Sequence, residues 1–300
     1  MGFEPENTVS EYRTVCRPPA KGRTDLYLLG VQGSGKSAME ASVLRYMTDA
    51  RLLRYVPHTD NQGTDLMQPY YYGLMEALDE GTTPAATPIG TLAAMQFDIG
   101  RHFKKPLTMV DYSGKALKTL SEAVSVGDEA WDNPLGRSLK NDNPKTLVFV
   151  FDYAIVSGRD QRFSAIDQEM ILDNVLHVVS TDGTGRYGDK GCTLEKVRNA
   201  AVVVTKSDLM EEDLGRPLSI DERADYAFDY LRDRCSSFMN HLGDLCHKHD
   251  INANHKAHSR QVWVTTFSIG RPGAFADVDS RRIAEFIEAT TAKRRLFGRL

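Results

Sequence analysis

The sequence predicts an α/β fold with three layers, in which helices cover both faces of a mostly parallel β-sheet. Apolar strand-like runs alternate with helical segments along the 300 residues, which is typical of parallel sheets. A glycine-rich loop at 30–37 joins the first strand to the first helix. Two strand candidates, 91–98 and 106–111, are separated by a short basic turn. This hairpin adds one antiparallel edge strand.

Each element is assigned from its hydrophobic pattern. Strands are short runs rich in Val, Leu and Phe, such as 146–151, because the strands of a parallel sheet are buried on both faces. Helices carry apolar residues three and four positions apart, as at Met39 and Val43. Ser219 and Glu222 match the pattern that opens a helix. The predicted elements are a strand at 24–30, helices at 38–54 and 65–79, strands at 91–98 and 106–111, a helix at 115–125, a strand at 146–151, a helix at 160–180, a strand at 200–204, a helix at 221–248, a strand at 261–268 and a helix at 278–296.

A single domain is expected over 22–300, preceded by a polar tail or arm at 1–21. Long connections interrupt the strand–helix alternation near 54–90, 126–145 and 181–199, and we interpret them as insertions. A connection as long as 54–90 inside a compact domain is usually functional or mobile. We therefore expect these insertions to provide partner surfaces.

Composition excludes several classes of function. The chain has 37 Lys and Arg against 41 Asp and Glu, a net charge of -4, so no electrostatic case for nucleic-acid binding arises. Its four cysteines show no C-x-x-C spacing, which indicates reduced thiols. No apolar run approaches the roughly 18 residues that span a bilayer. We expect a cytoplasmic protein that does not bind membranes.

The loop from Gly30 to Ser37 fits the pattern G-x-x-x-x-G-K-[ST] and stands between a strand and a helix, as a phosphate-binding loop requires. Its backbone N–H groups and the positive end of the following helix suit a polyphosphate. Lys36 is expected to reach the β- and γ-phosphates. The expected phosphate ligands are Gly30, Gln32, Gly33, Ser34, Gly35 and Lys36, with Ser37 as a ligand of Mg²⁺.

Two further polar clusters directly follow strands, where ligands bind in such sheets. Asp111 and Gly114 fit Asp-x-x-Gly; Asp111 would hold Mg²⁺, and the Gly114 N–H would contact the γ-phosphate. Thr205, Lys206 and Asp208 follow a buried strand. The Asp208 carboxylate can accept from both N1–H and the exocyclic amine of guanine, a donor pair that adenine lacks. Lys206 would cover the purine face, and Thr205 would brace the loop.

In these motifs the sequence resembles the translation-factor and Ras-like (TRAFAC) class of P-loop GTPases, and more loosely bacterial small GTPase-like proteins. The resemblance implies a Ras-like G domain with GTP or GDP and Mg²⁺ as ligands. It also implies a last base-contacting loop at 267–270, in which the Ser268 N–H meets guanine O6 beside Ile269. A threonine of the first switch should bind Mg²⁺; Thr87 fits best, and Thr83 and Thr91 are alternatives.

One position departs from that class. Ras-like members carry a Gln after the second-switch glycine to orient the attacking water, whereas this chain has Lys115. Charged lysine cannot accept a proton, so we expect slow GTP hydrolysis that a protein partner stimulates. Arg54 and Arg159 are candidates for an internal catalytic arginine. The expected function is a guanine-nucleotide switch with a protein effector or activator. A nucleotide-binding scaffold without turnover and an ATP-using P-loop enzyme remain alternatives.

Overall fold

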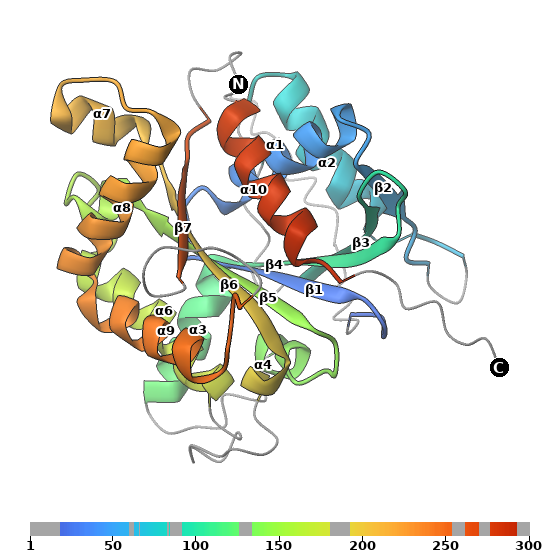
Figure 1. Ribbon diagram of the computed structural model, residues 1–300. Coiled ribbons are helices and arrows are strands. Elements are labelled where there is room, and N and C mark those ends of the chain that lie inside the picture. The colour runs from blue at the N-terminus through green and yellow to red at the C-terminus, as the bar shows by residue number, and fades with distance from the viewer. Residues whose placement is uncertain are drawn as a thin grey trace, which may run out of the picture.

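A seven-stranded sheet of order β2-β3-β4-β1-β5-β6-β7 forms the centre of the protein (Figure 1). The computed structural model describes residues 19–59, 63–65, 67–82, 84, 92–125, 134–180, 193–253, 262–269 and 277–292. The strands are β1 Thr24–Leu29, β2 Leu53–Val56, β3 Leu92–Ile99, β4 Lys105–Tyr112, β5 Lys145–Asp152, β6 Val197–Thr205 and β7 Trp263–Phe267.

All neighbouring strands run parallel except at β3, which is antiparallel to both β2 and β4. This confirms the mostly parallel sheet with antiparallel pairing at one edge. Strand β2 itself was not predicted, and it covers β3 by pairing Leu53 with Ile99 and Val56 with Gln96. The antiparallel strand, β3, is therefore the second strand of the sheet, and β2 is the edge strand. A four-residue strand has too short a pattern to be recognised without its partner.

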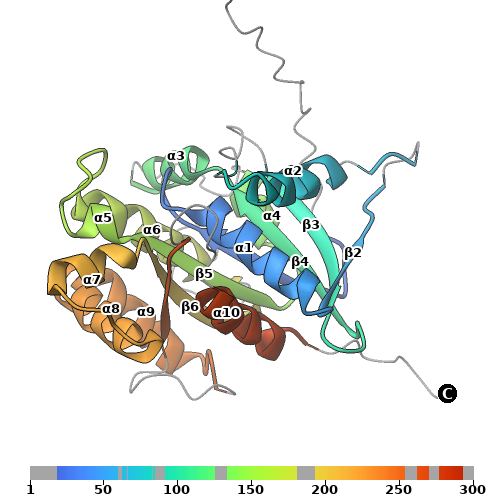
Figure 2. The same cartoon turned by 90° about the horizontal axis from the view of Figure 1, so that it is seen from above.

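Helices cover both faces of the sheet and complete three layers (Figures 1 and 2). Helices α1, α2 and α10 lie on one face, and α3, α4, α6 and α9 lie on the other. The bounds are α1 Lys36–Asp49, α2 Gln68–Asp79, α3 Gly114–Ser125, α4 Pro134–Leu139, α5 Tyr153–Val156, α6 Ala165–Ser180, α7 Asp208–Leu214, α8 Ile220–Arg234, α9 Ser236–Lys248 and α10 Asp277–Thr290, with a short 3₁₀ turn at Thr193–Lys196.

Each central strand contributes alternate side chains to two separate cores. On β1, Leu26 and Leu28 face α1 and α10, whereas Tyr27 and Leu29 join the core beneath α3 and α6. Burial of each such large side chain contributes about 1.5–3 kcal/mol. Because both faces are buried, the strands read as continuous apolar runs, which is why the sequence located them well.

Several predicted helices differ from those observed. The helix expected at 65–79 begins at Gln68, and the one expected at 278–296 ends at Thr290. The helix expected at 38–54 ends at Asp49, because Arg51 adopts a left-handed backbone (φ 55°) and the chain then enters β2. The helix expected at 160–180 begins at Ala165, and the short α5 precedes it. The helix expected at 221–248 is two helices separated at Cys235, whose φ of -128° and ψ of 50° end α8. This break lets α8 pack near β7 and α9 pack against α6.

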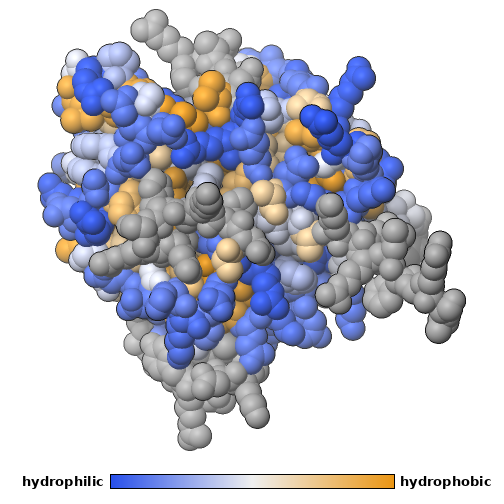
Figure 3. Space-filling view, viewed as in Figure 1, coloured by the Kyte–Doolittle hydropathy of each residue, from blue (hydrophilic) through white to orange (hydrophobic). Residues whose placement is uncertain are grey.

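The described residues on the face in Figure 3 give little sign of a large apolar contact area. Hydrophilic residues predominate on the face in Figure 3, and apolar residues form small separate areas. Among the described residues, the exposed large apolar side chains are Tyr72, Ile166, Met170, Leu214 and Val278. No helix in the described ranges has the length and apolar character needed to cross a membrane.

A buried polar network holds the amino-terminal ends of β1 and β5 together. The Asp25 carboxylate accepts hydrogen bonds from Asn141 Nδ2 at 2.7 Å and from Asn143 Nδ2 at 3.1 Å. Lys145 Nζ donates to the Asn143 carbonyl at 2.9 Å. Burial raises the pKa of Asp25 to about 6, against the lowering effect of these donors. The network therefore supports a carboxylate that is costly to bury.

Asn143→Ala is expected to destabilise the protein by about 2–3 kcal/mol, because a buried carboxylate loses a donor. The same change removes the acceptor of the Gly22 N–H. Urea unfolding measures the loss. Asp244→Ala, at an exposed position on α9, is the control and should change stability by less than about 0.5 kcal/mol. Equal stability of the two variants would contradict the role of the network.

Candidate nucleotide-binding site

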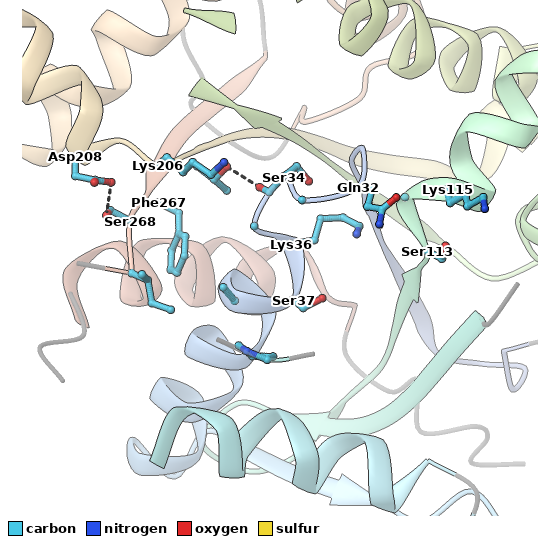
Figure 4. Close-up of a pocket in the computed structure, with 17 residues that line it drawn as sticks. Gln32, Ser34, Lys36, Ser37, Ser113, Lys115, Lys206, Asp208, Phe267 and Ser268 are labelled. Carbon is cyan, nitrogen blue, oxygen red and sulfur yellow. Dashed lines mark hydrogen bonds between the residues drawn. The ribbon is translucent and has the colours of Figure 1, made fainter. Parts of the chain in front are cut away.

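A cavity of about 420 Å³ lies at the carboxyl ends of β1, β4, β6 and β7 (Figure 4). The four polar clusters singled out in the sequence all contribute to its wall. The lining residues are 32–38, Pro84, 113–115, Thr205, Lys206, Asp208 and 267–269. The sheet brings these segments together because, apart from Pro84 between α2 and β3, each lies at or directly after the end of a strand.

The phosphate loop has the backbone that its sequence requires. Gly33 and Gly35 both adopt a φ of 78°, a conformation that favours glycine. Helix α1 begins at Lys36, and no described side chain caps its first turn. Free N–H groups at a helix start attract anions, so the loop fits a polyphosphate. Gly30 packs below the loop, where a Cβ would lie 2.8 Å from the Val150 carbonyl.

Thr205 braces this loop from the neighbouring strands. Its hydroxyl lies 2.6 Å from the Ser34 carbonyl oxygen and 3.0 Å from the Phe151 carbonyl oxygen. The first contact is to the phosphate loop, and the second is to β5. The last residue of β6 therefore fixes the loop to the sheet.

Lys36 and Asp111 form an ion pair below the loop. Lys36 Nζ lies 3.7 Å from Asp111 Oδ1, and both side chains are buried. The Tyr70 hydroxyl, from α2, donates to Asp111 Oδ2 at 2.6 Å. Ser37 lines the cavity one residue further along α1. Mg²⁺ prefers oxygen ligands, and the Ser37 hydroxyl and the Asp111 carboxylate are of that type.

The third expected metal ligand, Thr87, lies outside the described residues, as do its alternatives Thr83 and Thr91.

Gly114 lies against the phosphate loop. A Cβ at this position would be 2.2 Å from the Gln32 backbone nitrogen, so glycine alone fits there. Gly114 is also the first residue of α3, and the Ser113 hydroxyl accepts from the Ala116 N–H at 3.4 Å. Lys115 follows, is exposed and lines the cavity. This segment is close enough to respond to a ligand held by the loop.

Glu40 is a buried carboxyl group that the sequence analysis missed. It is 1% exposed, and neither of its carboxyl oxygens hydrogen-bonds to any of the described residues. Burial raises its pKa well above 4.5, Asp111 raises it further, and Lys36 lowers it. In the sequence, Glu40 could have been noticed because it is a charged residue on the apolar face of the predicted helix, four positions after Lys36.

Lys206 lines the end of the cavity where the base is expected. This residue has a left-handed backbone with a φ of 56°, which is uncommon for a side chain other than glycine. Its Nζ donates to Asp152 Oδ2 at 2.5 Å. Burial raises the pKa of Asp152, and the Lys206 ammonium opposes that effect. The lysine stem is thereby directed along the cavity wall beside Thr205.

Asp208 is held by the loop after β7. Ser268 Oγ donates to Asp208 Oδ1 at 2.7 Å, and the Ser268 N–H donates to Asp279 Oδ2 at 3.1 Å. Asp279 in turn pairs with Arg223 at 2.5 Å. The Ser268 N–H was expected to meet guanine O6, but Asp279 already occupies it. Ile269, the next residue, also lines the cavity.

The two arginines considered from the sequence lie elsewhere. Arg54 pairs with Asp98, and Arg159 pairs with Glu212. Neither is among the residues that line the cavity.

No family model and no curated protein sequence matches the chain. Among solved structures, it is similar to the Ski7 GTPase-like domain of S. cerevisiae bound to GTP, with a TM-score of 0.38 and 13% identity over 84% of this chain and 43% of that chain. It is also similar to Roco2 RocCORdC of Methanosarcina barkeri bound to GDP, with a TM-score of 0.37 and 10% identity over 93% of this chain and 52% of that chain. The chain thus spans about half the length of each. Both similarities are low, so the proposals below depend on the residues of the site.

Glu40→Gln is expected to raise the free energy of unfolding at neutral pH. The raised pKa means that folded Glu40 keeps a proton which the unfolded chain releases above about pH 4.5. Stability therefore falls with rising pH, by about 1.4 kcal/mol per pH unit, until the folded pKa is reached. Glutamine removes this dependence.

Urea unfolding at about pH 5 and pH 7 should show an advantage of Glu40→Gln that grows with pH. Glu76→Gln, at an exposed position on α2, is the matched control and should show none. A variant that is less stable than the wild type at both pH values would refute the prediction.

Proposed function

We propose that this protein is a guanine-nucleotide-binding switch that binds GTP and GDP with Mg²⁺ and hydrolyses GTP slowly. The observation that supports this most is the shared cavity, in which the phosphate loop and Asp208 form opposite ends (Figure 4). A nucleotide needs both a phosphate site and a base site at a fixed separation. We assign the chain to a Ras-like G domain on the same grounds.

At the phosphate end, the backbone N–H groups of the loop and of the start of α1 hold the phosphates. Lys36 leaves its ion pair with Asp111 and binds the β- and γ-phosphates instead. The distance of 3.7 Å between Lys36 and Asp111 is that of a loose ion pair, which favours this exchange. Ser37, Asp111 and Thr87 would hold Mg²⁺, which neutralises phosphate charge when bound.

At the base end, Asp208 accepts from guanine N1–H and the exocyclic amine. Each carboxylate oxygen has two lone pairs, so the hydrogen bond from Ser268 leaves acceptor capacity for the base. Lys206 covers the purine face, and the N–H of Ile269 takes the role at O6 that Ser268 cannot fill. Adenine offers no matching donor pair and is disfavoured.

The γ-phosphate would order the segment around Gly114, since its backbone already touches the phosphate loop. Helix α2 reaches the same site through Tyr70 and exposes Tyr72 on its outer side. We infer that this helix belongs to the surface read by a protein effector or activator. Lys115 stands where a glutamine would orient the attacking water, so intrinsic hydrolysis is slow. The same residue favours the second candidate function, a nucleotide-binding scaffold that does not hydrolyse its nucleotide.

Lys36→Ala is expected to weaken GTP binding about 10- to 100-fold, because a charged hydrogen bond to phosphate contributes about 1.5–3 kcal/mol. Calorimetry with GTP, GDP and ATP measures binding and base preference together. Lys118→Ala, which removes an exposed lysine on α3, is the control. Retained tight GTP binding by Lys36→Ala would exclude this loop as the phosphate site, and equal affinity for ATP would favour the ATP-using alternative.

Asp208→Asn is expected to lower GTP affinity and to raise relative affinity for xanthosine triphosphate, because the asparagine amide donates to the 2-oxo group. A shift in preference of about 10-fold or more corresponds to about 1.4 kcal/mol. Competition binding measures the ratio. Asp233→Asn, at a strongly exposed carboxylate, should leave it unchanged, and an unaltered ratio in Asp208→Asn would remove the guanine assignment.

A further inference from the structure

The connection between α5 and α6 places Arg162 against the phosphate loop. A Cβ at Gly33 would lie 2.7 Å from Arg162 Nη1, 3.1 Å from Nη2 and 3.2 Å from Cζ. The guanidinium group therefore lies directly over the Cα atom of Gly33, in space that any other residue at that position would fill. The sequence analysis did not single out this arginine, because it is remote from the loop in the chain.

The Arg162 guanidinium group pairs with the carboxylate of Asp160. Its Nε donates to Asp160 Oδ2 at 2.9 Å, two residues away on the same connection. Arg162 Nη2 also donates to Asp160 Oδ2. The Arg162 side chain is 57% exposed and that of Asp160 is 18% exposed, so the pair is open to solvent on the arginine side, where ion pairs contribute little to stability. The guanidinium can leave Asp160 without disturbing the core.

Other arginines near the sheet are committed to structural partners. Arg23 binds the Leu107 carbonyl, and Arg223 binds Asp279. Arg54 and Arg159 are held at the positions given above. Arg162 is, like Arg54 and Arg159, outside the residues that line the cavity, but its guanidinium lies against Gly33 of the phosphate loop.

We infer that Arg162 is a catalytic arginine supplied by the protein itself, which moves from Asp160 to the β- and γ-phosphates of bound GTP. This inference rests on the proposed function. A triphosphate carries several negative charges against one on Asp160, and the guanidinium fork matches phosphate oxygens in two parallel hydrogen bonds. Arginine in this role stabilises charge but does not orient the attacking water, so hydrolysis stays slow without a glutamine at position 115.

The reaction is hydrolysis of the γ-phosphoryl group. A water oxygen forms a bond to the γ-phosphorus while the bond from that phosphorus to the β–γ bridging oxygen breaks. The electron pair of the broken bond stays on the β-phosphate of GDP. The water loses one proton to solvent, and the products are GDP, hydrogen phosphate and that proton. Negative charge grows on the bridging oxygen, where the guanidinium acts.

The test compares wild type, Arg162→Ala, Arg162→Lys and Arg159→Ala. Arg159 belongs to the same connection but pairs with Glu212 and Asp213, so it is the matched control. Arg162→Ala should reduce single-turnover GTP hydrolysis at least about 100-fold, within the range expected for a catalytic arginine. It should bind GDP within about 2-fold of wild type but bind GDP with aluminium fluoride and Mg²⁺ at least about 100-fold more weakly.

Arg162→Lys should recover only part of both losses, because lysine keeps the charge without the planar fork. The inference is overturned if Arg162→Ala hydrolyses GTP at the wild-type rate, if it loses GDP affinity as strongly as affinity for the aluminium fluoride complex, or if wild type binds GTP without hydrolysing it. Wild type that binds no guanine nucleotide would instead overturn the proposed function itself. Unfolding temperatures of all four proteins confirm that they are folded.

Discussion

The hydroxyl of Thr205 connects the two ends of the cavity. It lies 2.6 Å from the Ser34 carbonyl of the phosphate loop and 3.0 Å from the Phe151 carbonyl of β5. Thr205 ends β6 and directly precedes Lys206, so the base-side loop cannot shift without moving the phosphate loop. The spacing between the proposed phosphate site and the proposed base site is therefore set by hydrogen bonds at strand ends. A nucleotide would find this spacing already formed, which lowers the cost of binding.

Beneath the loop, the protein retains buried ionisable groups whose burial does not favour folding. Lys36 and Asp111 pair at 3.7 Å, and Glu40 beside them has neither oxygen hydrogen-bonded to the described residues. Burial of ionisable groups without full pairing costs stability. Such costs are commonly retained at functional sites. Tyr70 extends this cluster to α2, the helix whose outer side carries Tyr72.

The sequence by itself determined the layers of the fold and the segments that make the site. Buried strands such as 146–151 are recognised by their continuous apolar composition. The loop at 30–37 requires a backbone conformation that glycine adopts more readily than other residues. Because parallel strands end on one side of a sheet, the order of motifs along the chain was enough to predict that Lys36, Gly114 and Asp208 would border one cavity. Each of these sequence patterns spans only a few consecutive residues.

Only the tertiary structure decided which side chains meet across those segments. The pairing of β2 with β3 and the break at Cys235 depend on partners distant in sequence. The same holds for Arg162 over Gly33 and for Ser268, whose N–H is taken by Asp279. A local pattern specifies the backbone of a segment, whereas side-chain partners depend on packing between segments. The partner of a charged side chain, such as Asp279 for Arg223, can lie far away in the sequence, where no local spacing reveals it.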